Sequence, residues 1–326
     1  MDLVSTYRPP AQSSPIPFLK GHGTENDFVI IPDPDNALDL SASAVVKLCD
    51  RRAGIGGDGL LHVVRSAAHP DARSMAERAE WFMDYRNSDG SVAEMCGNGL
   101  RVFARYLRRA GLVDAGDLAV ATRAGVKQVH IAKDSETADA SGSEKASGSG
   151  TSDDAAAAAG AITSHMGRAL LTEDDVTVVV GERGWPARNV NMGNPHAVAF
   201  VDDLDHAGNL FTAPSVTPES VYPDGVNVEF VVARGPRHVA MRVHERGSGE
   251  TRSCGTGACA VAVAAARRDG VDPSVTGEPV TYTVDVPGGR LVITERPDGE
   301  IEMAGPAVIV AEGVLDAEWT ERPDTL

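Results

Sequence analysis

The sequence predicts an α+β fold, and three of its features carry this prediction. Short stretches in which apolar residues alternate with others are bounded by Gly, Pro and Asp, which is typical of strands joined by turns. Convincing helices are few, and Ala258 to Ala266 is apolar nearly all round, so we expect a sheet to enclose it. An internal repeat then predicts two such units. The strand-like stretches are Phe28–Ile31, Ala197–Val201, Val226–Val232, Val280–Val286 and Leu291–Ile293.

The repeat is built around two Cys-Gly-x-Gly motifs, which begin at Cys96 and Cys254. In each half a strand-like stretch precedes the motif, and an apolar helix follows that should end at Gly111 or Gly270. Asn87 and Glu245 each stand nine residues before a cysteine. The pattern predicts two similar lobes. Other corresponding features are Asn26 and Asn194, Asp58 and Asp224, the strands Trp81–Tyr85 and Val239–Val243, and the pairs Arg108–Arg109 and Arg267–Arg268 in the last helical turns.

A compositional break separates the two halves of the repeat. Of the 27 residues from 134 to 160, 18 are Ser, Ala or Gly, and none is Val, Ile, Leu, Met or aromatic. Such a stretch cannot bury apolar surface, so we expect a solvated insertion. The predicted organisation is a flexible N-terminus over 1–15, an N-terminal lobe over 16–133, the insertion over 134–160 and a C-terminal lobe over 161–301.

Composition excludes several classes of partner. The 326 residues suit two domains, and a formal net charge of −17 argues against binding to nucleic acid or to anionic membranes. The first 20 residues contain no apolar segment of a secretory signal, and no apolar run approaches the roughly 20 residues that span a bilayer. We therefore expect a cytoplasmic location. In that compartment the four cysteines are not expected to form disulfides, and their spacing favours no metal site.

Each Cys-Gly-x-Gly motif places a thiol where a helix begins. Backbone N–H groups there attract anions, and the same field favours a thiolate, so a lowered cysteine pKa is expected. A carboxylate between two such ends would meet two sulfurs, of which one removes the α-proton and the other protonates the opposite face. This chemistry requires no cofactor. The alternative is that the cysteines are buried and inert, which is our interpretation of Cys49 and Cys259.

Long blocks of the chain resemble the diaminopimelate epimerase family, whose members interconvert the LL and meso forms of diaminopimelate on the way to lysine and cell-wall peptide. The resemblance covers nearly everything outside the insertion and the first fifteen or so residues. Its blocks are FLKGHGTENDFVII at 18–31, DRRAGIGGDGL at 50–60, residues 82–105, VNMGNPH at 190–196, DGVNVEF at 224–230 and HERGSGETRSCGTGACA at 244–260.

The resemblance implies pseudo-twofold symmetry, a site in the cleft between the lobes, and Cys96 and Cys254 as the acid–base pair. It further implies that His196 and Glu245 tune the cysteines and that residues 302–326 pack back on the first lobe. We also expect a homodimer. The implied contacts to a small-molecule substrate are Asn26, Asn87, Gly97, Asn98, Asn194, Asn227, Glu245, Arg246, Gly255 and Thr256.

Simpler roles remain open for several of these residues. Asn26, Asn87 and Asn227 lie near Asp or Gly and could simply form turns. His196 could be a packing residue, and Glu245 with Arg246 could be a solvated ion pair. At Gly59 the chain departs from relatives that carry Gln as a further substrate contact.

Two rival functions follow from the same motifs. A proline or hydroxyproline racemase shares the fold and the cysteines, but such enzymes typically carry His where Asn98 stands, and Glu245–Arg246 favours a substrate with a second charged end. The second rival is a redox-responsive binding protein, because two sulfurs that flank one carbon atom lie near disulfide distance.

Overall fold

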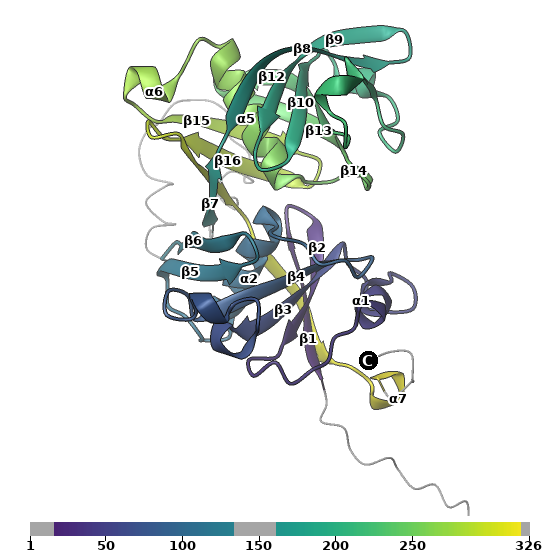
Figure 1. Cartoon of the computed structure of the whole chain (residues 1–326), viewed down its shortest axis with the longest axis vertical. Helices are drawn as coiled ribbons and strands as arrows, with labels where there is room; N and C mark the ends of the chain where they lie inside the picture. The colour runs from purple at the N-terminus through teal and green to yellow at the C-terminus, as the bar shows by residue number, and fades with distance from the viewer. Residues whose placement is uncertain (1–15, 134–160, 321–326) are drawn as a thin grey trace, which may run out of the picture.

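The computed structural model describes residues 16–133 and 161–320, so the predicted flexible N-terminus and the insertion lie outside the described residues. Strands and a few helices make up this part, which confirms the α+β class. Figure 1 shows two halves stacked along the long axis of the molecule. The elements of the first half are β1 (Pro17–Gly23), β2 (Asn26–Pro32), α1 (Ala42–Cys49), β3 (Gly59–Arg65), β4 (Trp81–Asn87), α2 (Gly97–Arg109), β5 (Gly116–Thr122), β6 (Gly125–Ile131) and β7 (Ile162–Arg168).

The second half begins with a long strand that continues directly from β7. Its elements are β8 (Leu170–Val180), β9 (Arg183–Asn191), β10 (Pro195–Phe200), β11 (Ser215–Thr217), β12 (Asn227–Gly235), β13 (His238–Glu245), β14 (Gly249–Thr251), α5 (Gly255–Arg268), α6 (Pro273–Thr276), β15 (Val280–Val286), β16 (Gly289–Glu295) and β17 (Glu300–Gly305). The chain ends with β18 (Val308–Val314) and α7 (Ala317–Thr320). Short 3-10 turns at 66–68, 73–75, 204–207 and 219–221 complete the structure.

The two halves have the same strand topology. Neighbouring strands follow the order β18-β1-β2-β3-β4-β5-β6-β7 in the first half and β8-β9-β10-β12-β13-β15-β16-β17 in the second. All pairs are antiparallel except β2–β3 and β4–β5, and their counterparts β10–β12 and β13–β15. The repeat in the sequence therefore corresponds to a repeat in topology.

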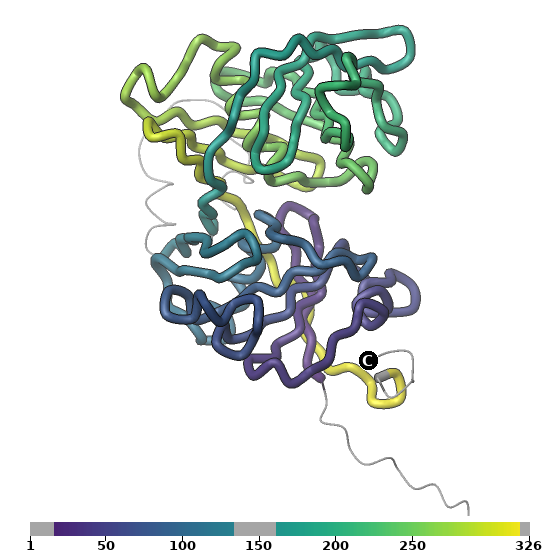
Figure 2. Tube along the Cα trace, viewed as in Figure 1, coloured from purple at the N-terminus to yellow at the C-terminus, as the bar shows by residue number. Residues whose placement is uncertain are grey.

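Two strand pairings tie the halves together. β7 pairs with β17, and β18 returns from the second half to pair with β1 (Figure 2). The C-terminal strand thus completes the sheet that the N-terminal strand begins.

Each half encloses one helix that starts at a cysteine. The side chains of α2 from Leu100 to Leu107 pack mostly inside the first sheet, and α5 is buried continuously from Gly257 to Ala266, as its all-round apolar pattern predicts. Both helices end at the predicted glycines, because Gly111 and Gly270 adopt the left-handed backbone that closes a helix (φ of 69° and 74°). The predicted helix ends are therefore confirmed.

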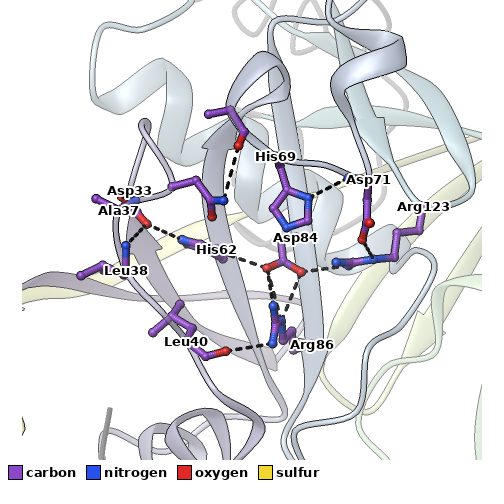
Figure 3. A network of polar contacts seen from close by, with 12 residues as sticks. Asp33, Ala37, Leu38, Leu40, His62, His69, Asp71, Asp84, Arg86 and Arg123 are labelled. Carbon is purple, nitrogen blue, oxygen red and sulfur yellow. Dashed lines mark hydrogen bonds and ion pairs between the residues drawn. The ribbon is translucent and has the colours of Figure 1, made fainter.

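A buried charge network holds the strands of the first half together (Figure 3). The side chain of Asp84 on β4 is fully buried and contacts His62 at 3.1 Å, Arg86 at 3.1 Å and Arg123 at 2.8 Å. The second ring nitrogen of His62 lies 3.0 Å from Asp33. Burial opposes the charge of Asp84, but these cationic partners outweigh it and lower the pKa of the carboxyl.

Candidate active site

Cys96 and Cys254 occupy the position immediately before the first turn of α2 and α5, with extended backbone (φ −138° and −113°). The glycines that follow them both face one methionine. A Cβ added at Gly97 or Gly255 would lie 2.8 or 3.2 Å from Cε of Met303. Because real Cβ atoms rarely approach so closely, the glycines let both helix starts converge around this side chain.

In the first half, Cys96 is half-buried and has neutral hydrogen-bond partners. Its sulfur accepts the backbone N–H of Gly99 at 3.4 Å, and its S–H points to Oδ1 of Asn26 at 3.7 Å. Asn26 begins β2 and donates from Nδ2 to Asp58 at 2.8 Å, while Arg51 holds Asp58 at 2.8 Å. These contacts turn the amide oxygen of Asn26 toward the sulfur.

Asn98 joins the two halves beside the cysteines. Its Nδ2 donates to Asn26 at 3.2 Å and to the carbonyl and hydroxyl oxygens of Ser253 at 3.1 and 3.2 Å. Its Oδ1 accepts a hydrogen bond of 2.9 Å from the buried guanidinium of Arg101. The Asn98 amide is thus engaged by the protein itself, and sequence analysis missed Ser253, the residue before Cys254.

In the second half, Cys254 is buried among polar side chains. Its sulfur lies 3.6 Å from Oγ1 of Thr256, which accepts a hydrogen bond of 3.4 Å from Nδ2 of Asn194. Glu245, at the end of β13, accepts a hydrogen bond from the Thr251 hydroxyl, and its charge acts on the Cys254 thiol. A carboxylate therefore faces this cysteine directly.

A buried histidine lies behind Asn194. His196 on β10 approaches Oδ1 of Asn194 with Nε2 at 3.2 Å and Oε1 of Glu229 with Nδ1 at 2.6 Å. Glu229 lies on β12, two residues after Asn227, so the two side chains share a face of the sheet. Sequence analysis did not identify Glu229, although this spacing was available to indicate it.

The remaining predicted substrate residues lie at the ends of strands. Asn227 accepts the backbone N–H of Arg246 at 2.9 Å, and Nη1 of Arg246 donates to the carbonyl of Asp224 at 2.9 Å. Asn87 instead donates to Ser91 at 3.0 Å, and no hydrogen bond within 16–133 and 161–320 joins it to either cysteine. It lies in the turn that follows β4, and its contact with substrate stays a prediction.

Gly59 has a structural reason to lack a side chain. It pairs with Asn87 across β3 and β4, and an added Cβ would lie 2.6 Å from the carbonyl oxygen of Arg86 and 2.7 Å from Cε2 of Tyr85. A glutamine here would overlap both atoms, so this backbone accommodates only glycine.

The predicted lowering of the cysteine pKa values is wrong. Burial raises the pKa of Cys96 to about 11, although the N–H of Gly99 partly offsets it. For Cys254 burial raises the pKa well above its ordinary value, and the carboxylates of Glu245 and Glu229 add to the increase. Burial also raises the pKa of Glu245. Loss of hydration at the sulfurs outweighs the field of the helix starts.

The structure also bears on metal and disulfide chemistry. All four cysteines are free thiols, and burial raises the pKa of Cys49 to about 11 and of Cys259 to about 12. This agrees with their interpretation as core residues. No group of three or more His, Cys, Asp and Glu side chains within the described part of the chain could hold a metal ion.

A family model described as diaminopimelate epimerase matches residues 18–146 and 188–310. The diaminopimelate epimerase of Streptomyces coelicolor is 73% identical over 309 residues, covering 95% of this chain and 98% of that one. That of Mycolicibacterium smegmatis is 43% identical over 312 residues, covering 93% and 97%.

Solved structures resemble the fold at much lower sequence identity. A phenazine biosynthesis protein of the PhzF family from Bacillus anthracis is 16% identical with a TM-score of 0.64, covering 93% of this chain and 99% of that one. A probable proline racemase from Agrobacterium radiobacter is 14% identical with a TM-score of 0.64, covering 95% of each. At this identity the likeness shows a shared fold.

Proposed function

The chain belongs to the diaminopimelate epimerase family, and we propose that it interconverts LL- and meso-diaminopimelate with Cys96 and Cys254 as the acid–base pair. The observation that carries the assignment of the pair is their equivalence. Each thiol begins the enclosed helix of one half of a topological repeat, and the Asn98–Ser253 contact joins the two positions.

The reaction needs two proton transfers at one carbon. The thiolate of one cysteine takes the α-hydrogen, so a C–H bond breaks, an S–H bond forms, and the electron pair enters the substrate carboxylate as an enediolate-like anion. The thiol of the other cysteine then gives its proton to the opposite face of the carbon. Backbone N–H groups at Gly97–Asn98 and Gly255–Thr256 begin the two helices and would bind the carboxylate as its charge grows.

The thiolate arises differently in the two halves. The carboxylate of Glu245 interacts with the Cys254 thiol and can take its proton. The S–H of Cys96 instead points to the neutral amide oxygen of Asn26, and burial opposes ionisation of this thiol. The α-ammonium of a bound substrate supplies positive charge that favours either thiolate.

The far end of the substrate carries a second amino-acid group, for which Arg246 is suited. The guanidinium donates one hydrogen bond to the Asp224 carbonyl, which orients the fork. A fork held in this way can bind a carboxylate through two parallel hydrogen bonds. This arrangement favours diaminopimelate over proline, which has no second charged end.

The direct test is conversion of LL-diaminopimelate by the purified chain with no added cofactor, followed by chiral chromatography. We expect meso-diaminopimelate to form and L-proline to remain unchanged in a parallel reaction. A requirement for pyridoxal phosphate, or racemisation of proline in place of diaminopimelate, would show the proposal to be wrong.

We further propose that the enzyme is a cytoplasmic homodimer. The valines at 308, 310 and 314 of β18 are 43%, 61% and 59% exposed, which supports a protein contact at this strand. Across the described residues, no helix has both the length and the apolar character of a membrane span. Light scattering should give twice the chain mass, and a monomer at micromolar concentration would contradict the dimer.

A further inference from the structure

Glu229 is a buried carboxylate that the acid–base mechanism leaves without a role. Its side chain is fully buried, and Oε1 binds Nδ1 of His196 at 2.6 Å. The other oxygen, Oε2, has no hydrogen-bond partner among the residues that the structure describes. Burying a carboxylate with one oxygen unsatisfied costs free energy, so stability does not explain its presence.

The position of Glu229 places it beside the reacting sulfur. A Cβ added at Gly257, in the first turn of α5, would lie 2.7 Å from Oε1 of Glu229 and 3.3 Å from Sγ of Cys254. The carboxylate and the sulfur thus flank the same glycine.

A chain of polar contacts leads from Glu229 to Cys254, and from the His196 ring onward each donor points toward the sulfur. Because the amide oxygen Oδ1 of Asn194 only accepts, Nε2 of His196 carries a hydrogen, and Nδ1 on the other side of the ring contacts Glu229. Nδ2 of Asn194 donates to Thr256, whose own hydroxyl hydrogen is then free for the sulfur. The successive separations are 2.6, 3.2, 3.4 and 3.6 Å.

We propose that Glu229 is a positioning residue that directs the hydrogen-bond donors of His196, Asn194 and Thr256 toward the sulfur of Cys254. We call this chain of hydrogen bonds, from Glu229 to Cys254, the relay. The inference rests on the proposed function, because the relay would stabilise the Cys254 thiolate that forms during turnover. In Glu229→Gln the new amide oxygen can accept from Nδ1 of His196; a ring whose single N–H lies there presents Nε2 as an acceptor, and the Asn194 amide then turns over. Thr256 then donates to Asn194 and accepts the S–H of Cys254, which favours the thiol.

Direct electrostatics and the relay predict opposite effects of removing this charge. The charged groups that act on Cys254 are the carboxylates of Glu245 and Glu229, and both raise the pKa of the thiol through space. Taken alone, loss of the Glu229 charge in Glu229→Gln would therefore make the thiolate easier to form. The relay predicts that the thiolate becomes harder to form, because its donors turn away.

The test is alkylation of the full chain by iodoacetamide without substrate, with peptide mass spectrometry to follow Cys254 and Cys96 separately. Since only the thiolate reacts, we expect Glu229→Gln to lower the Cys254 rate at a given pH about tenfold, equivalent to about one pKa unit. The Cys96 rate is the internal control and should not change. An unchanged or increased Cys254 rate would overturn the proposal.

Variants at Thr256 test the relay without altering Glu229. Thr256→Val removes the last donor and should slow Cys254 alkylation as Glu229→Gln does, whereas Thr256→Ser keeps the hydroxyl and should restore the rate. Adding Glu229→Gln to Thr256→Val should change nothing further, because both act through one chain. Additive losses would overturn the proposal.

Turnover separates this inference from the proposed function. In Glu229→Gln we expect kcat for epimerisation to fall about tenfold, because the relay acts on the reacting sulfur. An inactive wild-type enzyme with the predicted alkylation pattern would refute the function alone. An active wild-type enzyme, together with a Cys254 alkylation rate that Glu229→Gln does not lower, would refute the relay alone.

Discussion

Each half of the molecule contains a buried histidine paired with a buried carboxylate, and the two pairs differ in what lies beyond the ring. His62 and Asp84 are enclosed by charged partners, with Asp33 on the second ring nitrogen (Figure 3). His196 and Glu229 lead through Asn194 to the start of α5. The contact of the second ring nitrogen thus distinguishes the two pairs. In the first half it is another buried carboxylate of the strand network, and in the second half it is a residue of the candidate site.

The cysteines show the same contrast and give the largest expected effect. Cys96 has a helix N–H and a neutral amide, whereas Cys254 faces carboxylates. Because either direction of epimerisation needs both sulfurs, Cys96→Ala and Cys254→Ala should each lower kcat by about 10²- to 10⁴-fold. Initial rates in both directions measure this. Near-normal epimerisation in either variant would refute the pair.

The two buried carboxylates should differ in how much they contribute to the free energy of unfolding. Asp84→Asn leaves Arg86 and Arg123 without their buried anion and should lower the free energy of unfolding by about 3–5 kcal/mol. Glu229→Gln leaves no buried arginine without its anion and exchanges one set of hydrogen bonds for another, so it should cost about 1 kcal/mol. Urea unfolding of the two variants measures the difference, and equal losses would remove the distinction between the pairs.

Acid should weaken the first network. The folded pKa of Asp84 lies below its unfolded value, so its stabilisation is complete above about pH 4 and is lost as pH falls through the folded pKa. We expect the wild-type free energy of unfolding to decrease below about pH 4. Asp84→Asn should show a shallower decrease, not its abolition, because the pKa of Asp27 is lowered as well. Identical slopes in urea unfolding from pH 3 to 7 would contradict this role.

The third residue after each cysteine offers a matched pair of glycines for the smallest expected effect. A Cβ at Gly257 would meet the Glu229 carboxylate at 2.7 Å, whereas one at Gly99 would meet a methyl group of Leu61 at 3.2 Å. Gly257→Ala should therefore lower kcat about tenfold by displacing the relay, and Gly99→Ala about twofold. Steady-state kinetics of both variants measure the two kcat values, and a larger loss of kcat in Gly99→Ala than in Gly257→Ala would contradict this prediction.

Local patterns in the sequence predicted local features of the fold. The helix starts at Cys96 and Cys254, the helix ends at Gly111 and Gly270, and the enclosure of α5 each follow from a few neighbouring residues. The repeat predicted two similar lobes, and the two halves have the same strand order.

Features that depend on distant contacts were missed. Ser253 contacts Asn98 across the two halves, and Glu229 lies within a stretch that the sequence presents as an apolar strand. The sign of the cysteine pKa shifts was wrong for the same reason, because burial is set by the assembled fold and not by the helix start. The family resemblance supplied the candidate residues, and the structure adds the contacts that connect them.

The central claim is that two sulfurs act from opposite faces of one carbon, and exchange in deuterium oxide tests it most directly. With LL-diaminopimelate at early conversion, a two-thiol enzyme should place solvent deuterium at the α-carbon of the meso product while the remaining LL substrate keeps its hydrogen. One group that serves both faces would instead return the original hydrogen to the product or place deuterium in the recovered substrate. Mass spectrometry of both isomers distinguishes the outcomes, and the second one would contradict the account.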